Sequence, residues 1–89
     1  NFKIDEYLNL IQTLEDHKLD TKNIEKYFYY KNKRWDLLFS NNFKLMLPSK
    51  DIKKSIKIYK KLLDNGILIN IKTADLRIFN QIILTHYNE

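Results

Sequence analysis

The chain has 89 residues, with one Gly, one Pro, no Cys and a formal net charge of +5. This length predicts one domain with one hydrophobic core. The absence of cysteine excludes a disulfide framework, a zinc ribbon and a thiol nucleophile, and a single glycine excludes glycine-rich phosphate loops. The aliphatic runs Ile67–Ile69 and Ile82–Leu84 are far shorter than the roughly 20 apolar residues that cross a bilayer.

The positive charge comes almost entirely from lysine, because 14 of the 16 basic residues are Lys and only Arg34 and Arg77 are Arg. Asn and Ile are also frequent, which is typical of an AT-rich genome. Nucleic-acid readers favour Arg for its planar, forked donors. We therefore interpret the charge mainly as compositional bias and a solvated surface.

The first predicted element is a helix over residues 4–17. Apolar residues at Ile4, Leu8, Ile11 and Leu14, with Tyr7 beside them, form a stripe at helical spacing. Acidic residues in the first turn and a lysine near the end suit the helix dipole. The pattern predicts one buried face along this stripe.

Two strands are expected next, over residues 24–30 and 33–39. The first is rich in aromatic residues, and the second alternates, with Trp35, Leu37 and Phe39 on one face. A two-residue turn at Lys31-Asn32 would place Phe28 opposite Trp35 on the same face of the sheet. The alternation predicts that Trp35 lies in the core.

A second hairpin is predicted at Ser40–Asn42. A three-residue loop keeps the apolar face consistent, because it pairs Phe39 with Phe43, Leu37 with Leu45 and Trp35 with Leu47. Such loops place their last residue in the left-handed region, which asparagine tolerates. We therefore expect Asn42 to have a positive φ.

The rest of the chain predicts a second helix and two more strands. Pro48 ends the third strand, Ser49 is the expected N-cap of a helix over residues 50–64, and Gly66 supplies the left-handed stop. Strands are expected over residues 71–78 and 81–87. The fold class is α+β, with two amphipathic helices on one mostly antiparallel sheet of about five strands, in the order α-β-β-β-α-β-β.

This order and several motifs together resemble a known family. The segment Lys33-Arg34-Trp35-Asp36-Leu37, the Asn41-Asn42 hairpin, the Leu47-Pro48 step, the lysine-rich helix and the segment Asp75-Leu76-Arg77-Ile78 follow one another at matching spacing. They are similar to the β domain of FtsQ/DivIB bacterial cell-division proteins, especially those of alphaproteobacteria. Residues 1–89 would then form this single C-terminal domain, without the membrane anchor and the POTRA domain of the family.

The resemblance implies a scaffold rather than an enzyme. Family members are anchored in the inner membrane, act in the periplasm at the septum, and recruit the divisome partners FtsB and FtsL. No cofactor, metal, small-molecule ligand or nucleic acid is implied. The partner-binding surface carried over from the family comprises Lys33, Ile78, Phe79, Asn80, Gln81, Ile82 and Leu84. A last strand at the sheet edge would offer unpaired backbone groups for β-augmentation by a partner strand.

A small basic module that binds RNA or single-stranded DNA is the alternative. Tyr27, Phe28, Tyr29 and Tyr30 lie among basic residues, as in the stacking platforms of single-strand readers. Because a strand alternates faces, half of these aromatic rings are expected in the core. The lysines of the helix over residues 50–64 are interpreted as a solvated face, with anionic lipid or nucleic acid as alternatives.

Catalysis is the least favoured reading of the polar residues. His17 and His86 show no metal-ligand spacing, and Ser49 has no nearby base in the sequence. We interpret the pairs Arg34/Asp36 and Asp75/Arg77, each on one face of its strand, as structural.

Overall fold

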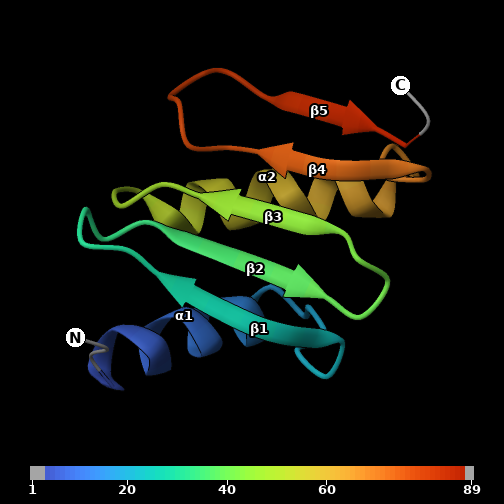
Figure 1. The fold of residues 1–89 in the computed structure, drawn as a ribbon. Coiled ribbons are helices and arrows are strands. Elements are labelled where there is room, and N and C mark those ends of the chain that lie inside the picture. Colours follow the sequence, from blue (N-terminus) through green and yellow to red (C-terminus); the bar gives the residue numbers. More distant parts are fainter. Residues whose placement is uncertain (1–3, 88–89) are drawn as a thin grey trace.

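The computed structural model describes residues 4–87 as two helices and five strands (Figure 1). In chain order these are α1 (Ile4–Asp16), β1 (Ile24–Tyr29), β2 (Trp35–Phe39), β3 (Lys44–Leu47), α2 (Ile52–Asp64), β4 (Ile71–Asp75) and β5 (Ile83–His86). The predicted α+β class and the element order are confirmed.

The five strands form one sheet in the order β1-β2-β3-β4-β5, so β1 and β5 are its edges. Neighbouring strands are antiparallel except β3 and β4, which are parallel because α2 crosses over between them. Both helices lie behind the sheet in Figure 1, α1 beside β1 and α2 behind β3 and β4. In the part of the chain that the structure describes, no helix covers the other face of the sheet.

The core lies between the helices and the rear face of the sheet. Trp35 is buried there, as predicted, together with Leu37, Leu45 and Leu47 of the central strands. Among residues 4–87 the buried apolar residues of this core are Leu10, Leu14, Leu19, Ile24, Trp35, Leu37, Phe39, Phe43, Leu45, Leu47, Ile56, Tyr59, Ile71, Ala74 and Leu76. Most of the rear-face positions in the sheet are therefore apolar.

The hairpin between β2 and β3 has the predicted three-residue loop. Leu37 pairs with Leu45 and Trp35 with Leu47. The Phe39 N–H donates to the Phe43 carbonyl oxygen over 2.8 Å, and Asn42 has a φ of 70°. This prediction is confirmed in both register and backbone conformation.

The predicted two-residue turn between β1 and β2 is wrong. Trp35 pairs with Tyr29, and Phe28 pairs with Asp36 on the open face. The Tyr30 N–H donates to the Arg34 carbonyl oxygen over 3.0 Å, and Lys33 has a φ of 68°. The loop therefore has three residues, like the next hairpin, and the shift of one residue turns Tyr29 toward the core.

The buried stripe of α1 is rotated from the predicted one. Leu10 and Leu14 are buried, and Tyr7 and Ile11 pack partly against the core. Ile4 and Leu8 are 65% and 54% exposed, so their predicted place in the core is wrong. The stripe that packs is spaced i, i+3, i+4, i+7, which also follows one helix face.

The start of α2 differs from the prediction, whereas its end agrees. Ser49 is not the N-cap; that position is Asp51, which has a φ of 55° and makes no side-chain capping bond. The Lys54 N–H donates to the Asp51 carbonyl oxygen over 3.0 Å, so the helix begins two residues later than expected. Gly66 has a φ of 70°, as its predicted role requires.

The last two strands are shorter than predicted. β4 ends at Asp75 rather than at residue 78, and β5 begins at Ile83 rather than at residue 81. The Asp75 carboxylate accepts hydrogen bonds from the backbone N–H and the guanidinium of Arg77, and this contact turns the chain out of the sheet. Residues 76–82 form a loop instead.

Candidate partner-binding site

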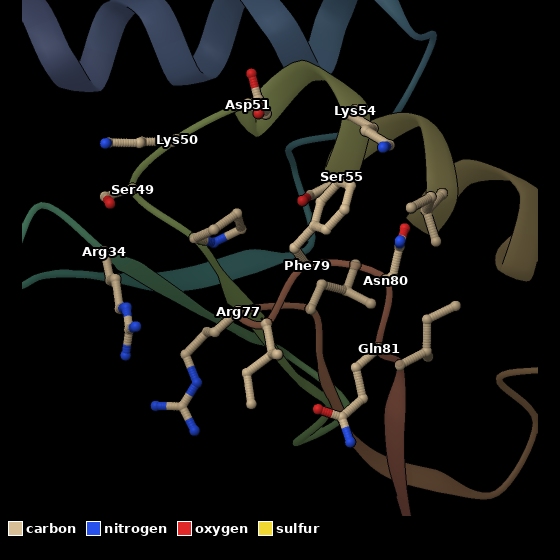
Figure 2. Close-up of a pocket in the computed structure, with 15 residues that line it drawn as sticks. Arg34, Ser49, Lys50, Asp51, Lys54, Ser55, Arg77, Phe79, Asn80 and Gln81 are labelled. Carbon is tan, nitrogen blue, oxygen red and sulfur yellow. The ribbon is translucent and has the colours of Figure 1, made fainter.

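A groove of about 610 Å³ lies between the start of α2 and the loop of residues 76–82 (Figure 2). Loop residues form one wall, and the segment that leads into α2 forms the other. The lining residues are Arg34, Pro48, Ser49, Lys50, Asp51, Lys54, Ser55, Ile58, Leu76, Arg77, Ile78, Phe79, Asn80, Gln81 and Ile82. The fold thus brings together segments that lie about 30 residues apart in the chain.

Phe79 connects the two walls of the groove. Its ring lies beside Lys54 in Figure 2, and the Lys54 Nζ atom is 4.4 Å from the ring centroid. An exposed cation–π contact of this kind contributes about 0.5–1 kcal/mol. Phe79 is nevertheless 70% exposed, so most of its apolar surface remains open to a partner.

The loop is held by local polar contacts at both ends. The Arg77 guanidinium donates to both carboxylate oxygens of Asp75, over 2.9 and 2.8 Å. These hydrogen bonds, above all, lower the pKa of Asp75. At the other end Asn80 has a φ of 58°, and the Gln81 N–H donates to the Ile78 carbonyl oxygen over 3.1 Å. Asp75 and Arg77 therefore pair with each other, although Arg77 lies in the loop and not on the strand where it was predicted.

Positive charge surrounds the groove. Four of its lining residues, Arg34, Lys50, Lys54 and Arg77, are cationic, whereas only Asp51 is acidic. The loop wall of the groove also presents the exposed apolar side chains of Ile78 and Ile82. The groove therefore suits a segment that presents apolar side chains together with an acidic group.

β5 lies directly beyond the groove and pairs with a strand on one side only. Asp75, Ala74 and Thr73 of β4 pair with Ile83, Leu84 and Thr85 of β5, and within residues 4–87 no strand pairs with its outer edge. Ile83 is 43% exposed on the open face of the sheet, and Leu84 packs toward the helices. The outer backbone groups of β5 are accessible to a further strand.

The structure brings together five of the seven residues predicted for partner binding. Residues 78–82 all line the groove and belong to the loop, although the predicted strands include Ile78, Gln81 and Ile82. Lys33 lies in the β1–β2 turn and does not line the groove, where Arg34 lies instead. Leu84 belongs to β5 and packs against the core.

Sequence reasoning missed the second wall of the groove. The sequence predicts Ser49 as the N-cap of a helix that contains Lys50 and Asp51, with Lys54 on its solvated face. Only the parallel packing of β4 beside β3 brings the loop of residues 76–82 next to them. No short sequence motif could predict this contact, because the contact depends on the crossover through α2.

The aromatic residues of β1 divide between the two faces, as predicted. Tyr27 and Tyr29 pack toward Trp35, with ring centroids 6.4 and 4.6 Å away. Phe28 and Tyr30 are exposed, and the Tyr30 hydroxyl donates to the Asp36 carboxylate over 3.1 Å. Two of the four rings are therefore engaged in the core and are not a free platform for stacked bases.

Asp36 pairs across the strands with Lys44, rather than with Arg34, which directly precedes its own strand. Asp36 is buried on the open face, and Lys44 of β3 lies 3.7 Å from its carboxylate.

In the described part of the chain, no helix is long and apolar enough to cross a membrane. Over the same residues, no group of three or more His, Asp or Glu side chains is placed to hold a metal ion.

A small α+β domain with an open sheet edge, beside a groove that is apolar and cationic, has the features of a protein-binding module. The family model described as the C-terminal domain of the cell division proteins FtsQ/DivIB matches residues 2–77. The chain therefore belongs to this family of non-enzymatic division proteins, which act through protein–protein interactions. No curated protein matches the chain. The family match ends at Arg77, before most of the groove loop and all of β5.

Proposed function

We propose that this domain is a scaffold of the bacterial division machinery that recruits FtsB- and FtsL-type proteins. In this proposal it acts on the periplasmic side of the inner membrane, as part of a longer single-pass membrane protein. The family supports a role in division. The observation that carries the proposal is the outer edge of β5, which pairs with no strand within residues 4–87 and lies beside an exposed apolar loop.

The edge of β5 supports binding by strand addition. A partner strand gains main-chain hydrogen bonds from such an edge, and neighbouring pockets supply the side-chain specificity. Ile83 on the open face and Ile82 at the entrance to the strand are both about half exposed. A partner strand with apolar residues at alternate positions would bury these side chains as it pairs.

The groove supports a second contact, next to the strand. Phe79, Ile78 and Ile82 offer apolar area, and the cations around them favour a carboxylate. We therefore expect the partner segment to continue from its paired strand into a short stretch with an acidic and an apolar side chain. Charge of this kind mainly sets the association rate and the orientation, whereas buried apolar contacts mainly set the dissociation rate.

A binding titration of the 89-residue chain tests this proposal. The ligand is a peptide that covers the periplasmic part of an FtsB-type protein, and the variants are Ile82→Asp and Ile82→Pro. Ile82 precedes the first residue pair between β4 and β5, so neither substitution removes a β4 pairing. Phe28→Asp is the matched control, because Phe28 is similarly exposed but lies on β1, at the opposite edge.

We expect saturable binding that both Ile82 variants weaken at least 30-fold, which is a loss in the range of interface hot spots. Phe28→Asp should change the affinity less than threefold. Circular dichroism of each variant verifies the fold. Equal binding by the wild type and the Ile82 variants would place the partner elsewhere. Equal losses in Phe28→Asp would likewise contradict an assignment to the β5 edge.

A further inference from the structure

The two helices carry opposite charge, although they have the same length and pack on the same face of the sheet. Over its 13 residues α1 has four acidic side chains and no basic one. Over its 13 residues α2 has five lysines and one aspartate. A compositional bias of the genome acts on both helices equally and does not produce this difference. The lysine content of α2 therefore calls for an explanation of its own.

Three of these lysines form a stripe along the outer face of α2. Lys53, Lys57 and Lys61 are spaced i, i+4, i+8 and are all exposed, whereas Ile56 and Tyr59 on the opposite side are buried. The one aspartate of the helix, Asp64, pairs with Lys60 over 3.0 Å. Within residues 4–87 none of the three stripe lysines makes an ion pair.

This stripe weakens the isolated helix. Like charges at i, i+4 repel one another on a helix surface, and the stripe contains two such pairs. Lys53 lies in the first turn of α2, where the helix dipole disfavours a cation and only the N-cap Asp51 is acidic. The repulsion between these lysines lowers the stability of the helix, and attraction to an anionic surface facing them would offset it.

Exposed aliphatic side chains follow α2 in the chain. After Gly66 the chain presents Ile67 and Ile69, which are 48% and 72% exposed. Leu63, in the last turn of α2, is also exposed. A basic helix face next to protruding aliphatic residues is typical of segments that lie on a membrane surface.

We propose that the outer face of α2, defined by Lys53, Lys57 and Lys61, binds the surface of an anionic lipid bilayer, with Ile67 and Ile69 inserted among the headgroups. The negative surface potential of the bilayer attracts each of the three lysines to a similar extent. Transfer of the two isoleucine side chains out of water adds a favourable hydrophobic contribution. The neighbouring helix α1 is acidic, so an anionic bilayer repels it. The domain therefore has a preferred orientation, in which α2 rather than α1 is closer to the lipid.

A bilayer explains these features better than a nucleic acid does. The outer face of α2 has no exposed aromatic ring between its lysines on which a base would stack. Ile67 and Ile69 would gain nothing from a phosphate backbone. None of the three stripe lysines lines the groove, so lipid and a partner strand occupy separate surfaces.

Cosedimentation of the 89-residue chain with vesicles tests the electrostatic part. Vesicles of phosphatidylcholine alone are compared with vesicles that contain 30% phosphatidylglycerol, at low and high salt. The test variant is K53Q/K57Q/K61Q. The matched control is K22Q/K26Q/K31Q, which removes the same charge from exposed lysines away from α2. We expect binding to anionic vesicles only, lowered about 100-fold by the test variant and much less by the control.

A second pair of variants tests the aliphatic part. I67S/I69S removes the exposed aliphatic side chains after α2, and I4S/L8S removes similarly exposed ones from α1. We expect I67S/I69S to weaken vesicle binding about tenfold at both salt concentrations and I4S/L8S to leave it unchanged.

Several results would overturn the proposal. They are equal sedimentation with neutral and anionic vesicles, equal losses in the two triple variants, and no vesicle binding at all. Binding to a single-stranded oligonucleotide with the same dependence on the three lysines, but not on the isoleucines, would assign the face to nucleic acid. Concentration-dependent association that K53Q/K57Q/K61Q abolishes, without vesicle binding, would assign it to a second copy of the chain.

Discussion

The two edges of the sheet are built differently. β1 carries two adjacent charged residues, Glu25 and Lys26, and a bulge on the edge strand itself between Ile24 and Lys26. β5 carries Ile83 and Leu84 at its start, and the irregularity in its pairing places the extra residue, Lys72, on the inner strand β4. Charges and bulges on an edge strand discourage further pairing. β1 is thus a protected edge, whereas β5 is left open.

The two edges also differ in how firmly they are attached. Tyr27 and Tyr29 hold β1 to Trp35, and Tyr27 also meets Tyr7 of α1 edge to face at 5.1 Å. On β5 only Leu84 packs against the core. Segments that move on binding belong to the less stable parts of a fold. The few core contacts of β5 therefore suit an edge that binds a further strand.

One row of residues crosses the open face from edge to edge and makes the comparison testable. Phe28, Asp36, Met46, Asp75 and Ile83 are successive partners through the four strand pairings. Phe28 and Ile83 end this row with nearly equal exposure, 40% and 43%. Variants at these two ends therefore change similar side chains at edges that we expect to behave differently.

The largest effect is expected at the anchor of β1. Trp35→Ala removes the ring that Tyr27 and Tyr29 contact and leaves a cavity, so we expect a loss of about 3–5 kcal/mol in the free energy of unfolding. Urea denaturation followed by circular dichroism measures this loss. Phe28→Ala, on the exposed side of the same edge, is expected to cost less than about 1 kcal/mol. Equal losses in the two variants would contradict the anchoring role of Trp35.

A smaller effect is expected at the anchor of β5. Leu84→Ala removes the one side chain of this strand that packs against the core. Because Leu84 is only partly buried, we expect a loss of about 2 kcal/mol. Amide hydrogen exchange shows where the loss acts: protection should fall in β5 before it falls in β1. Uniform loss of protection in both edges would mean that β5 does not open separately.

The sequence could predict most of the fold because its patterns are local. The β2–β3 hairpin follows from alternation alone, since Trp35, Leu37 and Phe39 allow one register with an apolar face. The β1–β2 hairpin has the same loop, and its last residue, Lys33, also has a positive φ. Lysine rarely adopts this conformation, so nothing in the sequence marks Lys33 as the last loop residue, and the predicted two-residue turn shifts the register by one residue.

The candidate site was less predictable, because tertiary contacts decide it. A strand over residues 71–78 fitted the local pattern, but the Asp75 carboxylate turns the chain at Arg77. In α1, Ile4 and Leu8 fitted a helical stripe as well as Leu10 did, and only the position of the sheet selects the face. The groove itself needs the crossover that places the loop of residues 76–82 against α2.

The protected edge should respond to alkaline pH. Burial, mainly, raises the pKa of Tyr27 on β1 from 10.0 to about 12. The neutral form is thus favoured in the folded state, so the contribution of Tyr27 is complete below pH 10 and is lost as the pH rises from 10 to 12. We expect a loss of about 1–2 kcal/mol over this window. Tyr27→Phe should remove this part of the slope in urea titrations, and an unchanged slope would contradict it.

The smallest effect concerns the ion pair beside β5. Hydrogen bonds from Arg77, above all, lower the pKa of Asp75 below 3.8. Its contribution is therefore present above about pH 4 and disappears as the pH falls through the lowered value. Because both side chains are partly exposed, we expect Asp75→Asn to cost only about 0.5–1 kcal/mol at pH 7.

This cost should shrink as the pH falls through the lowered pKa of Asp75, because the wild-type carboxylate becomes protonated as well. Urea denaturation of Asp75→Asn and the wild type, from pH 7 down through this range, measures the difference. Arg77→Gln is the matched control, because it breaks the same pair from the other side and should show the same pH dependence. Hydrogen exchange should locate the change in the loop of residues 76–82 and in β5. Loss of protection in β1 instead would mean that the two edges are coupled, which the separate anchors of Trp35 and Leu84 argue against.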